Sequence, residues 1–327
     1  MIRNLKFLLA LVAAAAFAVA PLLAAAQPST SRSVKIVVPV APAGAMDPFA
    51  RAIAQHLSEI WGQPVIVENR PGASQMIGAD YVSKSEPDGY TLLISEASPF
   101  VMNPHLFKKM PFDGVRGFTP ITMLVRVPWV IAVHPSVPAN NFQELVAFAK
   151  AKPGALSYGS FGLGSSVHIQ GDYLKKLLGI EILHVPYKGA GPAVSDLLGG
   201  QINMMMITPQ LVAPHARAGK LKLIAAAMAQ RIQALPNLPT VAESGVPGFS
   251  AGTWFALMAP PGLPRDILAR IHGDTMKVLN DPAFREQFVT KQWLEAVGNT
   301  PEQFAELLKS EHARWGELIR VSGVTVE

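Results

Sequence analysis

The sequence predicts an α/β protein of two lobes, each a sheet flanked by helices. Short apolar runs recur along the chain with stretches of helical periodicity between them, and these runs are continuously apolar. Continuous apolarity is typical of strands buried on both faces, as in a parallel sheet covered by helices. The pattern indicates the doubly wound α/β class. We expect strands at residues 34–40, 65–68, 90–95, 129–133, 183–185, 202–206 and 221–227.

The N-terminal segment has the layout of a signal peptide. Arg3 and Lys6 precede an apolar run over residues 7–23, and three alanines ending at Ala26 are followed by a polar residue. Small residues at that position are what a signal peptidase requires. An uncleaved anchor is the alternative, but the run is Ala-rich and Pro21 interrupts it. We therefore expect residues 1–26 to be a signal peptide cleaved after Ala26, and the mature chain to be periplasmic.

The composition excludes several classes of function. Cysteine is absent, which excludes disulfides, thiolate catalysis and Cys-ligated zinc. The eight histidines lack the spacing of metal ligands, and we expect neither a metal nor a cofactor. Loss of Arg3 and Lys6 with the signal peptide lowers the formal net charge from +5 to +3. Without a dense basic cluster and interleaved aromatic residues, nucleic-acid binding is not expected.

Two segments rich in Pro and Gly divide the mature chain into three blocks. They lie at residues 127–128 and 246–254. We interpret residues 27–128 and 252–327 together as lobe 1, and residues 129–251 as lobe 2. Two chain crossings then join the lobes as a hinge, and a hinge produces a cleft that can close.

The expected helices have recognisable apolar faces. One follows Asp47, a second follows Ser166 and a third ends the chain. Their apolar positions recur three or four residues apart, as an amphipathic helix requires. They include residues 49, 53 and 57, then 173, 174 and 177, then 304, 308, 315 and 318.

Four loops of small residues each connect an expected strand to an expected helix. They cover residues 38–48, 69–75, 158–168 and 185–192. Glycine lets the backbone approach a ligand closely, and the first turn of a helix leaves N–H groups unpaired with positive dipole character. Such loops bind carboxylate or phosphate oxygens and lie where ligands bind in open α/β sheets. The sequence therefore predicts an anion-binding cleft.

The candidate ligand-binding residues are small or polar residues of these loops and of two further strand ends. They are Ala43, Gly44, Ala45, Asp47, Ser74, Gln75, Ser98, Ser160, Gly162, Gly164, Ser165, Ser166, His168, Tyr187, Lys188 and Thr208.

Several of these candidates also have a purely structural interpretation. Asp47 is a good helix N-cap with Pro48 at the first helical position, and Ser165 and Ser166 are equally suited to capping. His168 can be a packing residue, and a single lysine such as Lys188 is usually solvated. The three methionines at residues 204–206 are expected to fill the core rather than bind a metal.

Enzymatic functions have weaker support in the same loops. Ser166 and His168 place a hydroxyl near an imidazole, but neighbouring positions on one turn do not form an oriented triad. There is no Gly-x-Ser-x-Gly elbow, dinucleotide fingerprint or phosphate-binding Gly-Lys-Ser/Thr motif. We expect a protein that is not an enzyme, with a secreted hydrolase as an alternative.

At these loops the chain resembles the Bordetella uptake gene (Bug) family, the extracytoplasmic receptors of tripartite tricarboxylate transporters. The matching segments include ENRPGASQMIGA at 68–79, PDGYTLL at 87–93, HVPYKGAGPAVSDLLGG at 184–200 and LPTVAESG at 238–245. Residues 38–51, 103–107, 118–120, 157–168 and 254–264 match in the same order. The resemblance covers essentially the whole mature chain.

The resemblance implies a type II-like periplasmic binding protein fold with a small carboxylate as its ligand. The partners it implies are the inner-membrane permease subunits of such a transporter, and we expect a monomer. In similar proteins, the loops that match residues 41–47 and 160–166 hold a ligand carboxylate through backbone groups and bridging waters. A sensor that presents its ligand to a membrane histidine kinase is an alternative function.

Two positions depart from the family pattern. The first loop usually reads Pro-Gly-Gly and here reads Pro42-Ala43-Gly44. Where many relatives carry an aspartate, this chain has Ile207. Because that carboxylate is a plausible partner for a ligand ammonium, its loss leads us to expect a ligand without an amino group, such as an aromatic or dicarboxylic acid.

Overall fold

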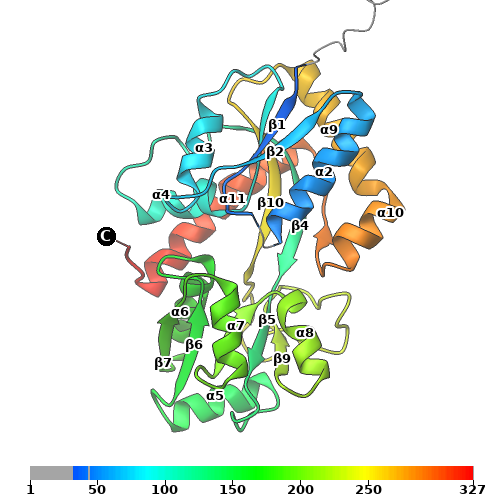
Figure 1. The fold of residues 1–327 in the computed structure, drawn as a ribbon. Helices are drawn as coiled ribbons and strands as arrows, with labels where there is room; N and C mark the ends of the chain where they lie inside the picture. Colours follow the sequence, from blue (N-terminus) through cyan, green and yellow to red (C-terminus); the bar gives the residue numbers. More distant parts are fainter. Residues whose placement is uncertain (1–31, 43–44, 327) are drawn as a thin grey trace, which may run out of the picture. The chain divides into compact units, whose positions relative to one another are not determined.

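The chain is organised around two β-sheets, shown in Figure 1. The structure is a computed structural model that describes residues 32–42 and 45–326. The expected signal peptide and the candidates Ala43 and Gly44 lie outside these residues. From Ser33 onward the chain forms one compact unit.

The first sheet has the strand order β11-β4-β10-β3-β1-β2. Strand β1 is parallel to β2 and β3, whereas β10 is antiparallel to β3 and β4. The antiparallel pairing differs from the parallel sheet that the apolar runs indicate, because a strand buried on both faces looks the same in either direction. The strands are β1 (Val34–Val38), β2 (Val65–Asn69), β3 (Thr91–Ser95), β4 (Thr119–Pro128), β10 (Gly252–Ala259) and β11 (Glu295–Ala296).

The second sheet has the order β7-β6-β8-β5-β9 and is also mixed. Strand β6 is parallel to β7 and β8, whereas β5 is antiparallel to β8 and β9. The fold class is therefore the expected one, with two sheets flanked by helices. The strands are β5 (Val130–Val133), β6 (Leu156–Ser160), β7 (Ile182–Pro186), β8 (Met204–Ile207) and β9 (Lys222–Ala226).

The chain passes between the sheets twice. It leaves the first sheet where β4 ends at Pro128 and enters the second where β5 begins at Val130. It returns between the end of β9 at Ala226 and the start of β10 at Gly252. Lobe boundaries at 128/129 and 251/252, and movement about these crossings, remain predictions.

Helices cover both faces of each sheet (Figure 1). Two short π-helical turns, η2 (Ser98–Met102) and η3 (Arg285–Thr290), accompany the first sheet. The helices that follow its strands are α2 (Met46–Trp61), α3 (Met76–Ser83), α4 (Asn103–Leu106), α9 (Arg265–Asn280), α10 (Pro282–Phe284) and α11 (Pro301–Ser322). Those of the second sheet are α5 (Phe142–Ala151), α6 (Ser166–Leu178), α7 (Ala190–Leu198) and α8 (Pro209–Arg217).

Successive residues of the central strands enter different hydrophobic clusters on opposite faces. In β1, Ile36 packs in a cluster with α2 and α9, whereas Val37 packs in a cluster with α11. In β8, Met205 and the flanking Met204 and Met206 divide in the same way, and all three are buried. Because each large apolar side chain contributes roughly 1.5–3 kcal/mol when buried, continuously apolar strands require helices on both sides.

Helices α6 and α11 connect the layers of the two sheets. Ile169 of α6 is fully buried in the cluster that contains Phe304 and Trp315 of α11. The Gln170 side chain joins α6 to the first residue of β10: its Nε2 donates to the Gly252 carbonyl at 3.2 Å, and its Oε1 accepts from the Gly252 N–H at 3.0 Å. The second-sheet helix α6 is therefore held against the first sheet.

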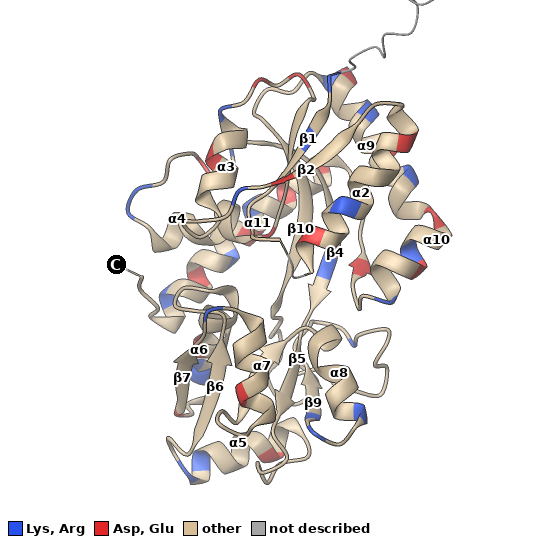
Figure 2. Ribbon diagram, in the orientation of Figure 1, with Lys and Arg blue, Asp and Glu red and all other residues tan. Residues whose placement is uncertain are grey.

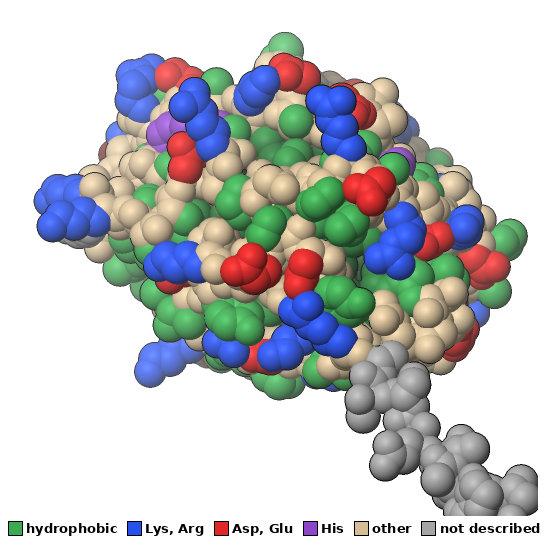
Figure 3. Space-filling view, turned by 90° about the horizontal axis from the view of Figure 1, so that it is seen from above, with side chains coloured by type: hydrophobic (Ala, Val, Ile, Leu, Met, Phe, Trp, Pro, Cys, Tyr) green, Lys and Arg blue, Asp and Glu red, His purple; other side chains and the backbone are tan. Residues whose placement is uncertain are grey.

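The positions of Lys, Arg, Asp and Glu are spread over the elements of both sheets in Figure 2. The face seen in Figure 3 carries basic and acidic side chains next to one another, with apolar groups between them. None of the described helices combines the length and apolarity needed to cross a membrane. Residues 32–42 and 45–326 also contain no group of three or more potential metal-ligating His, Asp or Glu side chains.

Candidate functional site

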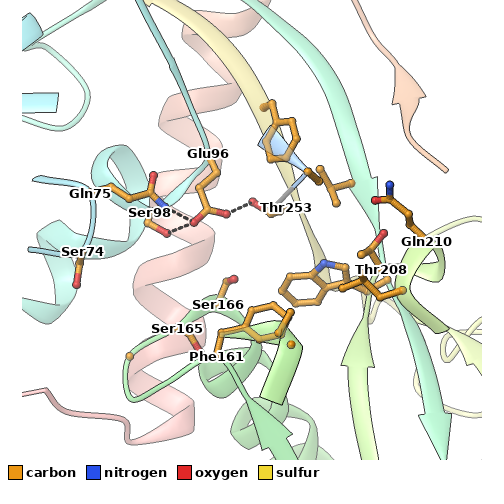
Figure 4. Close-up of a pocket in the computed structure, with 18 of the residues that line it drawn as sticks. Ser74, Gln75, Glu96, Ser98, Phe161, Ser165, Ser166, Thr208, Gln210 and Thr253 are labelled. Carbon is orange, nitrogen blue, oxygen red and sulfur yellow. Dashed lines mark hydrogen bonds between the residues drawn. The ribbon is translucent and has the colours of Figure 1, made fainter. Parts of the chain in front are cut away.

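A cavity of about 910 Å³ is lined by residues that follow strands of both sheets (Figure 4). Its wall combines hydroxyl and amide side chains with aromatic and aliphatic ones. This mixture is typical of small-molecule sites, in which apolar contacts fill the volume and a few polar groups orient the ligand. The lining residues are Ala45, Ser74, Gln75, Glu96, Ser98, Asn103, Val127, Trp129, Phe161, Leu163, Gly164, Ser165, Ser166, Ala190, Gly191, Thr208, Gln210, Leu211, Thr253 and Phe255.

The N-terminus of α6 forms part of the cavity wall. Ser165 is the N-cap, and its Oγ accepts from the His168 N–H at 3.3 Å while donating to the Gly162 carbonyl at 2.7 Å. Gly164 has a φ of +73°, a conformation that side chains rarely adopt. Ser165 therefore both caps α6 and lines the cavity. The first-turn N–H groups and the helix dipole give this end positive character, which suits a carboxylate.

His168 supports this loop from behind and does not line the cavity. Its Nδ1 accepts from the Gly164 N–H at 3.1 Å. Its Nε2 lies 3.4 Å from Asp172 Oδ2, and its ring stacks on His184 with a centroid separation of 3.9 Å. His168 thus positions the Gly164 backbone through one ring nitrogen while its other ring nitrogen faces Asp172.

Asp172 lies at the centre of the cluster beneath the loop. It accepts from the Tyr158 hydroxyl at 2.8 Å and from Lys175 Nζ at 2.7 Å. Burial alone would raise the pKa of Asp172, but its hydrogen bonds with His168, Lys175 and Tyr158 outweigh burial and lower it. Burial and the neighbouring His168 lower the pKa of His184 to about 4. The cluster is therefore built around an ionised Asp172 and a neutral His184.

This geometry does not assemble the hydrolytic pair suggested by Ser166 and His168. Both ring nitrogens of His168 are engaged, one by Gly164 and the other by Asp172. A second pair exists between Ser160 Oγ and His184 Nε2 at 2.6 Å. Ser160 is fully buried, however, and does not line the cavity.

Asp47 does not cap its helix as expected. Helix α2 begins at Met46, its N-cap is Ala45, and Pro48 falls within the first turn rather than at the first helical position. The Asp47 carboxylate instead accepts from Arg51 at 3.0 and 3.1 Å and from Asn69 Nδ2 at 2.8 Å. The capping prediction was wrong because Asp47 is the second residue of α2 and its carboxylate is held by Arg51 and by Asn69 at the end of β2. Ala45 lines the cavity, whereas Asp47 does not.

The loop before α3 brings polar groups to the cavity in a strained conformation. Ala73, Ser74 and Gln75 have φ angles of +46°, +51° and +71°. Each left-handed residue other than glycine costs roughly 1–2 kcal/mol. Asn103 Nδ2 donates to the Ser74 carbonyl at 2.8 Å, and Ser95 Oγ donates to Gln75 Oε1 at 3.1 Å. The surrounding side chains therefore hold Ser74 and Gln75 at the cavity.

Glu96 lines the cavity but was not among the sequence candidates. It directly follows β3, at the same kind of strand end as the loops identified in the sequence. Its Oε1 accepts from Gln75 Nε2 and, at 3.0 Å, from Ser98 Oγ, while its Oε2 accepts from Thr253 Oγ1 at 3.3 Å. Burial raises its pKa. The signal that could have found it is an acidic residue directly after a buried strand.

The predicted candidates divide into those at the cavity and those beside it. Eight line it: Ala45, Ser74, Gln75, Ser98, Gly164, Ser165, Ser166 and Thr208. Six described candidates do not: Asp47, Ser160, Gly162, His168, Tyr187 and Lys188. The Tyr187 hydroxyl donates to Asp196 at 2.7 Å. Burial is the main cause, and this hydrogen bond the second, that raises the pKa of Tyr187 to about 12. Lys188 is exposed. From its loop, residues 185–192, only Ala190 and Gly191 are among the described residues that line the cavity.

Two helix-covered sheets, two chain crossings and a cavity lined from both sides are typical of periplasmic solute-binding proteins. The family model of the tripartite tricarboxylate transporter family receptor (TctC) matches residues 49–324. The chain therefore belongs to the TctC family, and the resemblance to the Bug proteins is confirmed.

Relatives and solved structures agree with this assignment. Protein BugT of Bordetella pertussis is 35% identical, with 91% of each chain covered. The solved structure "R. palustris Rpa4515 with adipate" is 32% identical, has a TM-score of 0.81, and is matched over 91% of this chain and 99% of its own. "MatC (Rpa3494) from Rhodopseudomonas palustris with bound malate" is 29% identical, with a TM-score of 0.76 and coverage of 88% and 99%.

Proposed function

We propose that this protein is a periplasmic receptor that captures a small organic carboxylate and delivers it to a tripartite tricarboxylate transporter. The observation that carries the proposal is the capped N-terminus of α6 in the wall of the cavity. Its backbone N–H groups, together with Ser165 and Ser166, form the subsite for the ligand carboxylate. The adipate and malate named for two solved relatives belong to the same chemical class.

The binding step is tested by isothermal titration calorimetry with adipate, malate and a series of mono- and dicarboxylates. A ligand that binds only the folded protein also raises its melting temperature. We expect saturable 1:1 binding without conversion of the ligand, which is recovered unchanged after long incubation. Turnover of the ligand, or no binding of any carboxylate, would contradict the proposal.

Gly164 provides a variant that locates the subsite. A Cβ there would meet Val326 Cγ1 at 2.5 Å, and the φ of +73° disfavours a branched side chain. We expect Gly164→Val to reduce affinity at least about tenfold, since the loop must move away from the ligand. Gly154→Val is the matched control, because Gly154 has the same φ and lies outside the cavity. Lys188→Ala should change affinity by less than about threefold, since exposed charges contribute little.

Delivery and export need tests in cells. Deleting the permease subunits should abolish ligand uptake while leaving the purified receptor's affinity unchanged. If uptake persists without the permease subunits, and deletion of the receptor abolishes a ligand-induced transcriptional response, the histidine-kinase sensor is supported instead. Sequencing of the protein from a periplasmic fraction should give Gln27 as the first residue if cleavage follows Ala26.

A further inference from the structure

Glu96 gives the cavity an unusual charge for a carboxylate-binding site. Among the described residues that line the cavity, Glu96 is the only ionisable one, so no lysine or arginine faces the ligand there. An anionic ligand would therefore enter a cavity whose one formal charge has the same sign. Helix dipoles and hydroxyl groups can hold one carboxylate, but they do not neutralise Glu96.

The carboxylate of Glu96 is held in place by neutral donors from three segments. Gln75 precedes α3, Ser98 begins η2 and Thr253 lies in β10. The Gln75 amide is itself fixed, because its Oε1 accepts from Ser95 Oγ. Figure 4 shows Glu96 between Gln75 and Ser98 on one side and Thr253 on the other. The position of the carboxylate is therefore set before a ligand arrives.

These donors leave room for a further partner. An ionised carboxylate can accept about four hydrogen bonds, and Glu96 accepts three, of which only the one from Thr253 reaches Oε2. None of the three donors carries a charge, and burial raises the pKa of the group without an opposing cation. A positively charged group at Oε2 would satisfy both the geometry and the charge.

We propose that Glu96 selects a ligand that carries an ammonium group in addition to its carboxylate. The ammonium pairs with Glu96 beside the first sheet, and the carboxylate lies at the N-terminus of α6 beside the second sheet. This inference rests on the proposed function and names the substrate class of its site. Neutral zwitterions also avoid placing a second negative charge beside Glu96, as a fully ionised dicarboxylate in the same orientation would.

A ligand with an ammonium group is the opposite of what Ile207 led us to expect, which was a ligand without an amino group. Ile207 is fully buried in the cluster that contains Val130 and Ala132, and it does not line the cavity. A carboxylate is present at the cavity after all, but it comes from the end of β3 rather than from the end of β8.

The test compares three matched ligand series at pH 7.5 by isothermal titration calorimetry. Amino carboxylates of three to eight carbons, with the amino group at the α or the terminal carbon, are compared with the corresponding monocarboxylates and dicarboxylates. We expect the best amino carboxylate to bind at least about tenfold more tightly than both of its counterparts, because only it pairs with the partly buried Glu96 carboxylate.

Glu96→Gln should remove this preference. It keeps the size of the side chain and one carbonyl acceptor but loses the charge, so the amino carboxylate should weaken at least about tenfold and the monocarboxylate less than about threefold. Glu295→Gln is the control, since Glu295 is also a partly buried glutamate with a raised pKa but does not line the cavity. Melting temperatures without ligand show that both variants fold. If Glu96→Gln does not fold, the inference is tested by whether the unaltered protein binds the amino carboxylate more tightly than the matching monocarboxylate and dicarboxylate.

The other outcomes separate this inference from the proposed function. Tightest binding of a dicarboxylate, with affinity that rises as the pH falls, would mean that Glu96 donates a proton to the ligand. That result overturns the inference and leaves the receptor function standing. A preference for amino carboxylates that survives Glu96→Gln also overturns it. If no member of the three series binds, both proposals fail.

Discussion

Ser165 contributes to the stability of α6 and to the predicted carboxylate subsite. We expect Ser165→Ala to lower the free energy of unfolding by about 1 kcal/mol, because the His168 N–H loses its cap. Ligand affinity should also fall severalfold, as measured by calorimetry alongside denaturant unfolding.

Thr300 offers the matched control for that variant. It caps α11 in a complete capping box with Gln303, and it does not line the cavity. Thr300→Ala should lower stability by a similar amount, about 1 kcal/mol, without changing ligand affinity. Equal losses of affinity in both variants would show that α6 capping acts only through global stability.

His184 should make stability dependent on pH. Its pKa is lowered from 6.5 to about 4 in the folded protein, so the unfolded chain binds more protons between these values. The neutral form stabilises the fold above pH 6.5, and this contribution is lost as the pH falls through about 4. Because the side chain is partly exposed, we expect a loss of only about 1 kcal/mol.

Urea unfolding at several pH values between 6.5 and 4 measures this effect. His184→Gln should flatten the dependence in that window, while retaining an acceptor near Ser160. His134→Gln, whose ring lies beside Ser136 rather than in this cluster, serves as the control. If the free energy of unfolding of His184→Gln still falls with pH as steeply as that of the unaltered protein, another group causes the pH dependence.

At the scale of elements, the loop before α3 stores backbone strain at the cavity. Ala73 is exposed and has a left-handed φ of +46°. We expect Ala73→Gly to be neutral or to stabilise the protein by up to about 1 kcal/mol, because glycine relieves that strain. The same change at Ala147, exposed in α5, should destabilise by about 1 kcal/mol. Thermal and urea unfolding of the two variants distinguish these signs.

The elements that the sequence predicts best are those defined by local signals. Strands β1, β2, β3, β5, β7, β8 and β9 were all expected, although the edge strands β2 and β7 are only partly buried. Gly164, Ser165 and Ser166 were identified as part of a loop that opens a helix. Strands β4, β10 and β11 were not among the expected strands. The antiparallel direction of β10 could not be predicted either, because strand direction depends on which distant segments pair. The strain at residues 73–75 was missed for a similar reason, since it is held by Asn103 and Ser95.

Side chains at the cavity were predicted less completely than the loops that carry them. Asp47 looked like a cap but accepts from Arg51 and Asn69, because the helix begins at Met46, two residues earlier than expected. Glu96 was missed because no local pattern shows that Gln75 and Thr253, far apart in sequence, meet at its carboxylate. Convergence of distant segments can be read only from the folded chain.

At the scale of the whole protein, ligand binding should bring the two sheets together. The cavity is lined from both, and two crossings connect them. We expect a saturating ligand to reduce the radius of gyration measured by small-angle X-ray scattering, because hinge closure is the usual response of such folds. An unchanged radius with ligand bound would indicate a preformed site.

Any such movement has a limited choice of axis. Ile169 is buried in the cluster around α11, and Gln170 forms two hydrogen bonds with Gly252 at one of the crossings. Separating the sheets on this side would break apolar and polar contacts together. On the side that bears α8, the ties are fewer: Gln210 Nε2 donates to Gln292 Oε1 at 2.6 Å, and Arg217 lies over the Trp293 ring. We therefore expect any opening to turn about the α6–α11 contact, so that the carboxylate subsite at the start of α6 moves least.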